Sequence, residues 1–259
     1  MFFEFEENGN VRLEPNIQCF AVVLDAFSKS NLPLAGSDAE AFLRRMADSG
    51  RPNLAPTTMC YNSVINAYAR SGSQLAGAEA ERLLREMAQN SDNRGASPDL
   101  VSYNSTINAY ARSKKANDAE RLLRELQSKC KDKPRLTPSN RSYNAVINAY
   151  AKDGNYEKAE LLLTEMRSEG GLKPDLFSYS SVLEAWSRSG SPQAGEKADT
   201  YLRILEDYPE NDNKRALRYT LAHICWRNSI GNHPQAEQRM KELSEILTEL
   251  QKEPGNRRH

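Results

Sequence analysis

One short phrase recurs through the middle of the chain, and this repetition constrains the fold more than any other feature. It reads CYNSVINAYAR from Cys60, SYNSTINAYAR from Ser102 and SYNAVINAYAK from Ser142. Weaker copies lie on both sides and begin at Cys19, Ser178 and Arg218. A period of about 40 residues is typical of solenoids, in which each unit packs only against its neighbours. We therefore predict one continuous array and not a set of separate globular domains.

Each unit has the pattern of two amphipathic helices. The first apolar stripe has the spacing of one helix face and comprises Tyr61, Val64, Ile65 and Tyr68. The second stripe has the same spacing and comprises Ala80, Leu83, Leu84 and Met87. A single hairpin cannot bury both stripes, so the hairpins must stack on one another. We predict an all-α fold, a right-handed α-solenoid of about five stacked helical hairpins plus a partial terminal one.

Turn-forming stretches rich in Gly, Pro and Asn set the expected boundaries of the units. Residues 1–16 are expected to be the remnant of an upstream repeat or an N-terminal tail, and residues 251–259 a disordered tail. The predicted repeats span 17–57, 58–99, 100–139, 140–175 and 176–215, followed by a partial repeat or C-terminal cap at 216–250.

Composition excludes several classes of function. Lys+Arg and Asp+Glu are equal at 35 each, so no global field attracts a polyanion. The four cysteines have no zinc-ligand spacing, and we expect reduced, mostly buried thiols. No apolar run is long enough to span a membrane, and no transit peptide is visible at the acidic N-terminus. Without a catalytic constellation or a phosphate-binding glycine loop, we predict a non-enzyme with no cofactor, metal or small-molecule substrate.

The repeated phrases resemble the pentatricopeptide repeat, a family of organellar RNA-binding helical solenoids. The resemblance rests on YNSVINAYAR, AERLLREM and the closing Ser-Pro-Asp, which recur in this order, and it covers roughly residues 15 to 245. The tetratricopeptide phrase with its Trp and Leu-Gly is absent. These units are longer than the family's usual unit, and longer loops put the register between repeats and bases in doubt.

The resemblance implies that two residues of each unit read one base: the residue after the first aromatic and the last residue of the unit. The central pairs are Asn62 with Asp99, Asn104 with Ser139, and Asn144 with Asp175. The outer pairs, Ser180 with Arg215 and Ala21 with Thr57, match no family rule. The family associates Asn with Asp with uridine, and Asn with Ser more loosely with a pyrimidine.

The resemblance also implies base-sandwiching side chains two residues before the first aromatic, at Met59, Val101, Arg141 and Phe177. Independently of the family, a basic residue ends each regular first helix, and such a row is able to follow a phosphate backbone. This row comprises Lys29, Arg70, Arg112, Lys152 and Arg188. The core stripe leaves an opposite polar face on each first helix, where we expect Asn62, Asn66 and their equivalents to line one groove.

Each of these residues also has a purely structural interpretation that needs no RNA. The asparagines are ordinary residues of a solvated helix face, Asp99 and Asp175 are good helix N-caps, and the basic row complements the negative ends of helices. The repeated tyrosines share the apolar stripe and are expected in the core.

Two functions therefore remain open. The first is a single-stranded RNA adaptor of organelle RNA metabolism that acts by occupancy and reads about one base per repeat with a pyrimidine bias. The family places it in mitochondria or plastids, and a short array needs a protein partner, self-association or further repeats. The second is a protein-binding scaffold or a subunit of a larger assembly such as a ribosome, which the neutral net charge favours.

Overall fold

The computed structural model describes residues 16–89, 96–168, 171–206 and 215–252, and it consists of helices joined by short loops. The first helices of the units are α1 (Ile17–Lys29), α3 (Thr58–Arg70), α6 (Leu100–Arg112), α8 (Asn140–Lys152), α10 (Leu176–Ser189) and α12 (Arg215–Asn228). The second helices are α2 (Ala35–Asp48), α4 (Ala76–Gln89), α7 (Ala116–Lys129), α9 (Tyr156–Ser168), α11 (Ala194–Glu206) and α13 (Ala236–Lys252). Short 3₁₀ turns, η1 (Pro52–Leu54) and η2 (Pro134–Leu136), precede α3 and α8.

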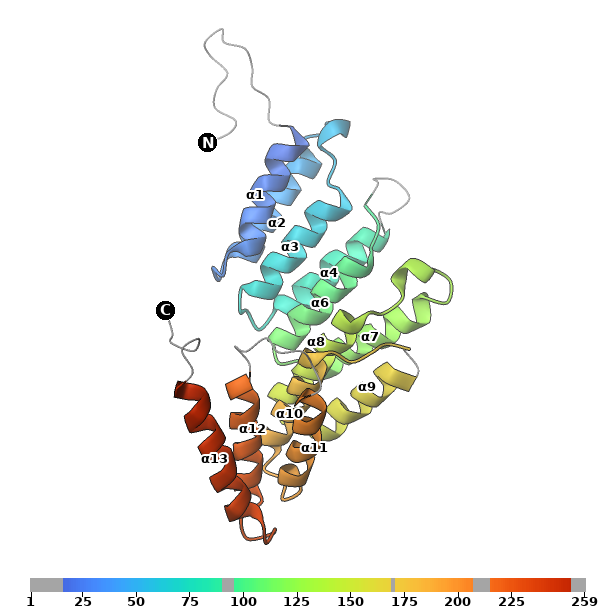
Figure 1. The fold of residues 1–259 in the computed structure, drawn as a ribbon. Coiled ribbons are helices and arrows are strands. Elements are labelled where there is room, and N and C mark those ends of the chain that lie inside the picture. The colour runs from blue at the N-terminus through green and yellow to red at the C-terminus, as the bar shows by residue number, and fades with distance from the viewer. Residues whose placement is uncertain (1–15, 90–95, 169–170, 207–214, 253–259) are drawn as a thin grey trace.

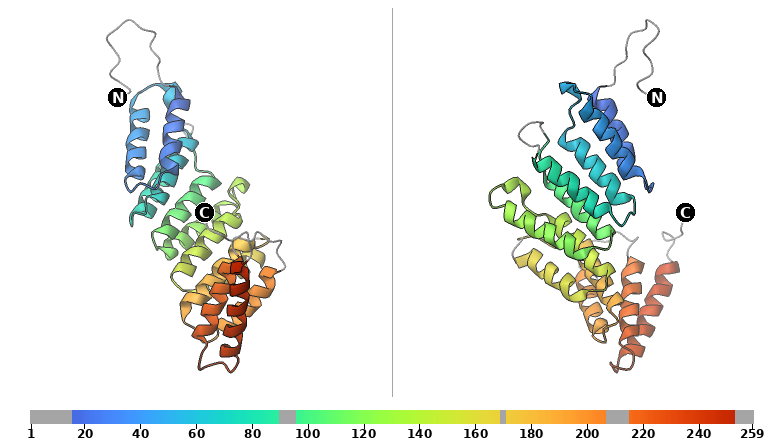
Figure 2. Two further views of the ribbon diagram at one scale, coloured as in Figure 1. Left: turned by 60° about the vertical axis from the view of Figure 1, so that its left-hand side comes forward. Right: turned by 180° about the vertical axis from the view of Figure 1, so that it is seen from behind.

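The hairpins stack into one curved array (Figures 1 and 2). Each first helix contacts the first helix of the next unit, so that α1, α3, α6, α8, α10 and α12 form a continuous layer. The second helices pack against this layer from the other side, and every described helix belongs to the array. The predicted all-α solenoid is confirmed. The last unit has both helices of a hairpin, and most of the two expected terminal tails lies outside the described residues.

The core is built from the two stripes that the spacing predicts. Val64 and Ile65 of α3 are buried, as are Leu83, Leu84 and Met87 of α4. The stripe tyrosines are buried in the later units and half-buried at Tyr68, which confirms their place in the core. Burial of such side chains is the main stabilising term of each hairpin.

An aromatic side chain near the end of each first helix from α3 onward fixes the register of neighbouring units. Each one donates a hydrogen bond to a carboxylate on the second helix of the preceding unit. The pairs are Tyr68 with Glu40 (2.7 Å), Tyr110 with Glu81 (2.6 Å), Tyr150 with Glu120 (2.5 Å), Trp186 with Glu160 (3.0 Å) and Trp226 with Asp199 (3.2 Å). The same contact therefore occurs at all five junctions between the described units.

A basic residue of the following second helix completes each of these contacts. The ion pairs are Arg82 with Glu40, Arg121 with Glu81, Lys158 with Glu120, Lys197 with Glu160 and Arg239 with Asp199. Burial alone acts to raise the pKa of the Glu81 carboxyl, but hydrogen bonds from Arg121, Tyr110 and Arg85 lower it to about 2. We call these carboxylate-centred contacts the outer ladder.

Glycine allows the aromatic ring to approach at three of these junctions. A Cβ on Gly77, in the first turn of α4, would lie 2.2 Å from a ring carbon of Tyr110. Gly36 and Gly195 have the same relation to Tyr68 and Trp226. Because no side chain fits beneath the ring, glycine is required there for close packing of the units.

The remaining structural expectations concern cysteines and membranes. All four cysteines are free, and Cys60 and Cys225 are buried, but Cys130 is half-buried and Cys19 is exposed. Cys19 is exposed because α1 has no described unit packed against its outer side. No helix among the described residues is both long and apolar enough to cross a membrane.

Candidate nucleic-acid interface

The residues that close units 2, 3 and 4 also cap the first helix of the next unit. Asp99 accepts a hydrogen bond from the Ser102 backbone N–H at 2.8 Å, and Asp175 accepts one from the Ser178 N–H at 2.9 Å. The capping role expected for the two aspartates is confirmed. Capping holds each carboxylate at the point where two successive first helices meet.

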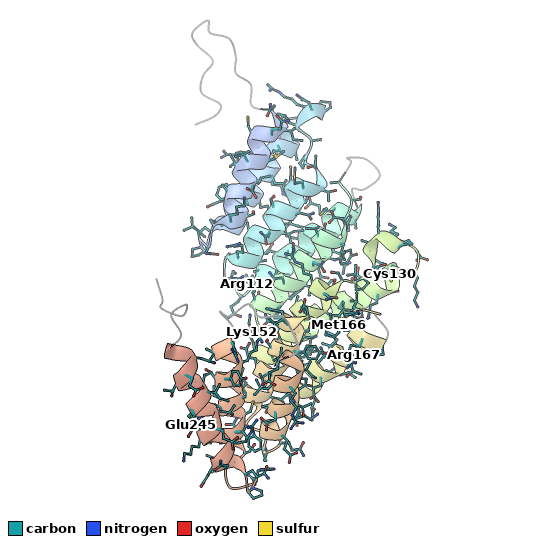
Figure 3. All side chains as sticks on the ribbon, viewed as in Figure 1. Arg112, Cys130, Lys152, Met166, Arg167 and Glu245 are labelled. Atoms are coloured by element: carbon teal, nitrogen blue, oxygen red, sulfur yellow. The ribbon has the colours of Figure 1, made fainter. Side chains whose placement is uncertain are left out.

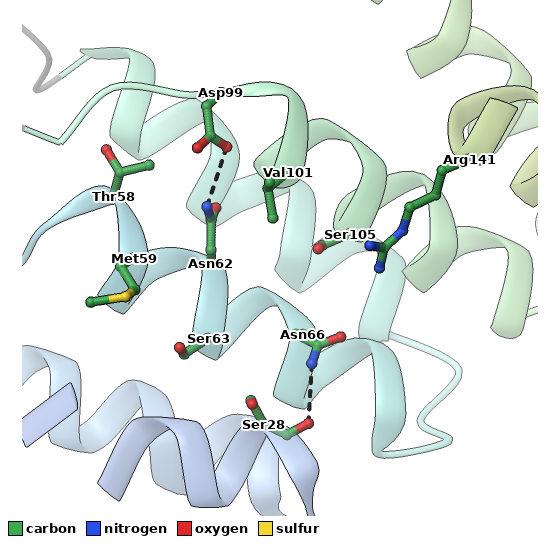
Figure 4. Close-up of a pocket in the computed structure, with 10 residues that line it drawn as sticks. All are labelled: Ser28, Thr58, Met59, Asn62, Ser63, Asn66, Asp99, Val101, Ser105 and Arg141. Carbon is green, nitrogen blue, oxygen red and sulfur yellow. Dashed lines mark hydrogen bonds between the residues drawn. The ribbon is translucent and has the colours of Figure 1, made fainter. Parts of the chain in front are cut away.

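Two of the predicted base-reading pairs are in direct contact. The side-chain nitrogen Nδ2 of Asn62 donates to Oδ1 of Asp99 at 3.2 Å (Figure 4). Asn144 Nδ2 donates to both carboxylate oxygens of Asp175, at 3.1 and 3.2 Å. Burial acts to raise the pKa of Asp175, but hydrogen bonds from Ser178 and Asn144 outweigh it and lower the pKa below its ordinary value. Asp175 is therefore an ionised acceptor at neutral pH.

A serine of the following helix completes the contacts of each asparagine. The Oγ hydroxyls of Ser102, Ser142 and Ser178 donate to the Oδ1 atoms of Asn62, Asn104 and Asn144, at 2.6, 2.6 and 2.7 Å respectively. The third predicted pair, Asn104 with Ser139, is thus connected only through Ser142, whose Oγ lies 3.4 Å from Ser139 Oγ. We call the asparagines, serines and capping residues of these three junctions the inner ladder.

The asparagines are less exposed than the expected open polar face implies. Asn62 is half-buried, but Asn104 and Asn144 are only 5% and 7% exposed, because the next first helix covers them. Asn66 donates to the backbone carbonyl of Ser28 in the preceding unit at 3.1 Å, so it ties two units together. The inner ladder therefore forms the floor between adjacent first helices and not a freely exposed row.

The outer predicted pairs do not form this arrangement. Ser180 Oγ is a buried atom with no hydrogen-bond partner among the described residues, and Arg215 is the first residue of α12. At the first junction, Ala21 has no polar side chain, and Thr57 Oγ1 lies 3.4 Å from Cys60 Sγ. The inner ladder is consequently confined to the junctions of units 2 to 5.

Apolar side chains project from the start of the first helices. Met59 is 63% exposed, and Val101 and Phe177 are also exposed, as expected for side chains available to stack on bases. Arg141 occupies the equivalent place in α8 and is exposed too. Sequence reasoning missed Leu217, which is 53% exposed on α12. Its position two residues before Tyr219 is the signal that would have identified it.

An open pocket of about 510 Å³ joins these features at the junction of units 2 and 3. It is lined by Met59 and Val101 on the apolar side, and by Asn62, Asp99, Asn66 and Arg141 among its polar residues. Figure 4 shows the Arg141 side chain reaching toward Ser105 from the neighbouring helix. The pocket combines apolar walls with hydrogen-bonding groups on its floor, which suits a flat, polar-edged ring.

Basic side chains gather at the other end of the first helices. Figure 3 shows Arg112 and Lys152 at the same edge of the array. Among the described residues, neither has a carboxylate within ion-pair distance, although the charge of Glu184 acts on Lys152. Burial, followed by the positive charge of Arg112, lowers the pKa of Lys152; the Glu184 carboxylate opposes this shift and the charge of Arg188 adds to it. Three cations of successive units therefore converge on one edge.

The other members of the predicted basic row have local partners. Lys29 pairs with Asp25 at 2.6 Å, Arg188 pairs with Glu184 at 2.8 Å, and Arg70 donates to Asn31. Many carboxylates are held in the outer ladder, whereas Arg112 and Lys152 lie at the opposite layer. A chain of zero formal net charge thus carries a locally positive edge.

No group of three or more His, Cys, Asp or Glu residues suited to a metal ion occurs in the part of the chain that the structure describes. His233 contacts Glu196 at 3.1 Å and the edge of the Trp226 ring, so its described contacts lie within the last two units.

Comparisons with known proteins point to one family. The chain matches the PPR repeat family over residues 138–188, the pentatricopeptide repeat domain over residues 82–150 and a PPR repeat over residues 59–73. A comparison with curated protein sequences gave no match.

Solved structures with the same fold include the PPR domain of Arabidopsis thaliana protein-only RNase P 1 in complex with tRNA. It is 13% identical with a TM-score of 0.55, and the match covers 86% of this chain and 95% of that chain. PPR10 from maize is 21% identical with a TM-score of 0.52, covering 91% of this chain and 35% of that one.

The complex of PPR10 with an 18-nt psaJ RNA element is 20% identical with a TM-score of 0.56. That match covers 95% of this chain and 36% of PPR10, so the chain spans about a third of the length of PPR10. At these identities the likeness concerns the fold.

Proposed function

The chain belongs to the pentatricopeptide repeat family, and from this premise we propose that it binds single-stranded RNA through the layer of first helices. Bases would insert between the exposed side chains of successive units, with Met59 and Val101 around the first of them. Their polar edges would meet the inner ladder, and the phosphates would follow the edge that carries Arg112 and Lys152.

The inner ladder supports a specific base preference, and it is the single observation that carries the proposal. A carboxylate accepts hydrogen bonds only, so Asp99 and Asp175 suit the N3–H donor of uracil and disfavour cytosine, whose N3 is an acceptor. Ser139 has a hydroxyl that both donates and accepts, and it suits either pyrimidine. The three central units would therefore read uridine, a pyrimidine and uridine in succession.

Occupancy of RNA is the activity that we propose, and not catalysis. The bound protein would shield the RNA, remodel it or recruit other proteins to it. In this way it would act in the stabilisation, processing or translation of an organelle transcript. A mitochondrial or plastid location is proposed from the family. Because stacking contributes about 1–3 kcal/mol per base and ordering opposes it, so short an array should bind weakly and in a salt-sensitive way.

Fluorescence anisotropy with labelled oligonucleotides tests this proposal. At low salt, an RNA with a central uridine-pyrimidine-uridine run should bind more tightly than an adenosine-rich RNA of the same length. The triple variant Asn62→Ala, Asn104→Ala, Asn144→Ala should lose that preference, because these amides and their partners form the inner ladder. Equal affinity of the wild-type protein for both RNAs would refute the proposal.

A protein-binding scaffold is the second candidate, and the outer units favour it. Ala21 and Ser180 lack the contacts of the inner ladder, so the first and fifth units have no evident base reader. Affinity purification separates the two functions. A stoichiometric protein partner that survives ribonuclease treatment supports the scaffold, whereas recovery that depends on RNA supports the adaptor.

A further inference from the structure

The three serines of the inner ladder are placed to orient the asparagine amides, although they are too deeply buried to contact a bound RNA themselves. Ser102, Ser142 and Ser178 are fully buried, and each stands at the third position of its first helix. Their hydroxyl oxygens accept the backbone N–H of Asp99, Ser139 and Asp175, at 3.2, 3.0 and 3.0 Å respectively. The hydroxyl hydrogens of Ser102 and Ser178 have two acceptors within reach, the asparagine of the preceding unit and the capping aspartate at 2.9 and 3.0 Å respectively. Ser142 has no carboxylate in this place, so its hydroxyl hydrogen is directed at Asn104.

Two of the three asparagine amides, those of Asn62 and Asn144, are each oriented by two contacts, one to a carboxylate and one to a serine. The carboxylates of Asp99 and Asp175 only accept, so the nitrogens of Asn62 and Asn144 must face them. The oxygens then face the serines. Removal of either serine leaves the carboxylate to hold the same orientation.

Asn104 is different because only one contact orients it. Its oxygen accepts from Ser142 Oγ at 2.6 Å, and its nitrogen has no hydrogen-bond partner among the described residues. That nitrogen is not fully sealed from solvent, although the residue is only 5% exposed. Without Ser142, nothing in the described structure distinguishes the two ends of the amide.

We propose that Ser142 is a specificity-determining residue: it holds Asn104 so that only an N–H donor is presented to the base of the third unit. This inference rests on the proposed RNA-binding function. A fixed donor suits the O2 carbonyl oxygen that uracil and cytosine share, and it disfavours adenine, which has a C2–H, unable to accept a hydrogen bond, at the corresponding place of its Watson–Crick edge. Loss of the Ser142 hydroxyl frees the amide to turn its oxygen outward, where it accepts from the adenine amino group.

The experiment measures affinities for three RNAs that differ only at the middle nucleotide of the uridine-pyrimidine-uridine run. Wild-type protein should prefer uridine or cytidine over adenosine at this nucleotide by about 5- to 150-fold, the range of a good directional contact. Ser142→Ala should bring this ratio to within about threefold of unity, while affinity for the uridine RNA falls less than the ratio does. An unchanged ratio in a folded Ser142→Ala variant overturns the inference.

Matched variants separate a positioning role from a structural one. Ser102→Ala and Ser178→Ala remove the same buried hydroxyl, but each should keep most of the discrimination at its own nucleotide because a carboxylate still orients the amide. Adding Ser139→Asp to Ser142→Ala should restore pyrimidine discrimination and shift it toward uridine. Equal losses in all three serine variants, or no rescue by the aspartate, contradict the inference.

Ser142→Cys guards against misfolding of the alanine variant, because Cys60 occupies the equivalent position of α3. The thiol is a weak donor, so this variant should also lose discrimination. Circular dichroism melts establish that each variant is folded. If wild-type protein itself shows no pyrimidine preference, the proposed function fails; if it does and both Ser142 variants keep it, only the inference fails.

Discussion

The three central junctions, between units 2 and 5, and the two flanking junctions share the contacts between second helices but differ in the contacts between first helices. The outer ladder joins an aromatic, a carboxylate and a cation at all five junctions, including those built on Glu40 and Asp199. The inner ladder occurs only where units 2 to 5 meet. Stacking and base reading are therefore carried by different residues on opposite layers, and each should be removable without the other.

Breaking the core should give the largest effect. Tyr103 is buried in α6 and its hydroxyl contacts Glu125 and Lys129, so Tyr103→Ala should lower the free energy of unfolding by about 3–5 kcal/mol. Phe177→Ala is the matched aromatic control, because this more exposed ring should cost far less stability than Tyr103 and weaken RNA binding by about 1–3 kcal/mol. Urea unfolding followed by circular dichroism measures the first quantity. Comparable destabilisation by both variants would contradict the division of roles.

Acid should weaken the outer ladder. The pKa of Glu81 in the outer ladder is lowered to about 2. Glu125 lies outside the outer ladder but joins the same second helices through Arg85 of α4, and hydrogen bonds from Arg85 and Lys129 outweigh burial and lower its pKa to about 2 as well. In the unfolded chain these carboxyls return to the ordinary value of 4.5. Their stabilising contribution is thus present above about pH 4.5 and is lost as the pH falls toward 2.

Urea midpoints measured from neutral pH downward test the acid sensitivity. The double variant Glu81→Gln, Glu125→Gln should be less stable at neutral pH and should show a shallower decline in acid. A wild-type midpoint that is constant between about pH 5 and pH 3 would show that the ladder contributes little.

Replacing a single predicted base-reading side chain in a central unit and in a flanking unit tests how the two kinds of unit differ. Asn144→Ala should reduce discrimination at one nucleotide by about 1–3 kcal/mol, because the amide lies between Asp175 and Ser178. Ser180→Ala should change no base preference, because this hydroxyl has no partner among the described residues. Anisotropy titrations with single-nucleotide variants of the RNA compare the two. A loss of preference in Ser180→Ala would place a reader outside the central units.

Transplanting the inner ladder tests whether its residues are sufficient. Ala21→Asn, Thr57→Asp and Cys60→Ser together reproduce at the first junction the contacts seen between units 2 and 3. The triple variant should acquire a uridine preference of about 1 kcal/mol at one additional nucleotide. Ala21→Asn alone is the control and should gain less, since nothing orients its amide. No gain in the triple variant would mean that reading needs more than these residues.

The smallest expected effect concerns the basic edge. Lys152→Ala should weaken binding to every RNA to a similar extent and should lower the salt slope of the affinity by about 0.7, the value of one contact to a single strand. Lys29→Ala is the control, because Lys29 is already paired with Asp25. A change in base preference without a change in slope would remove Lys152 from the phosphate path.

Much of the fold was predictable because periodicity reports burial directly. The stripe of Val64 and Ile65 is in the core, and the helices begin close to the capping residues Asp99 and Asp175. Period, stripe and cap are all local properties, so one sequence suffices to find them. Periodicity also placed Asn62 and its equivalents on the polar face of the first helices, whereas their pairing with Asp99, Ser139 and Asp175 came from the family resemblance.

The rest depends on contacts between units that no local pattern reports. Ser142 has the sequence signature of a helix cap, and only the stacking of α8 on α6 reveals its bond to Asn104. The deep burial of Asn104 has the same origin, since the covering helix lies some 40 residues further along the chain. The outer ladder likewise joins residues of successive units, such as Arg121 and Glu81.

A substitution scan of a bound RNA tests the central claim most directly. Each nucleotide of a short oligonucleotide that contains uridine-pyrimidine-uridine is replaced in turn by adenosine, and the affinity of the wild-type protein is measured. We predict that three adjacent nucleotides, one for each central junction, are sensitive and that the flanking nucleotides tolerate adenosine. Sensitivity at separated nucleotides, or adenosine tolerated throughout, would contradict an account in which Asn62, Asn104 and Asn144 read successive bases.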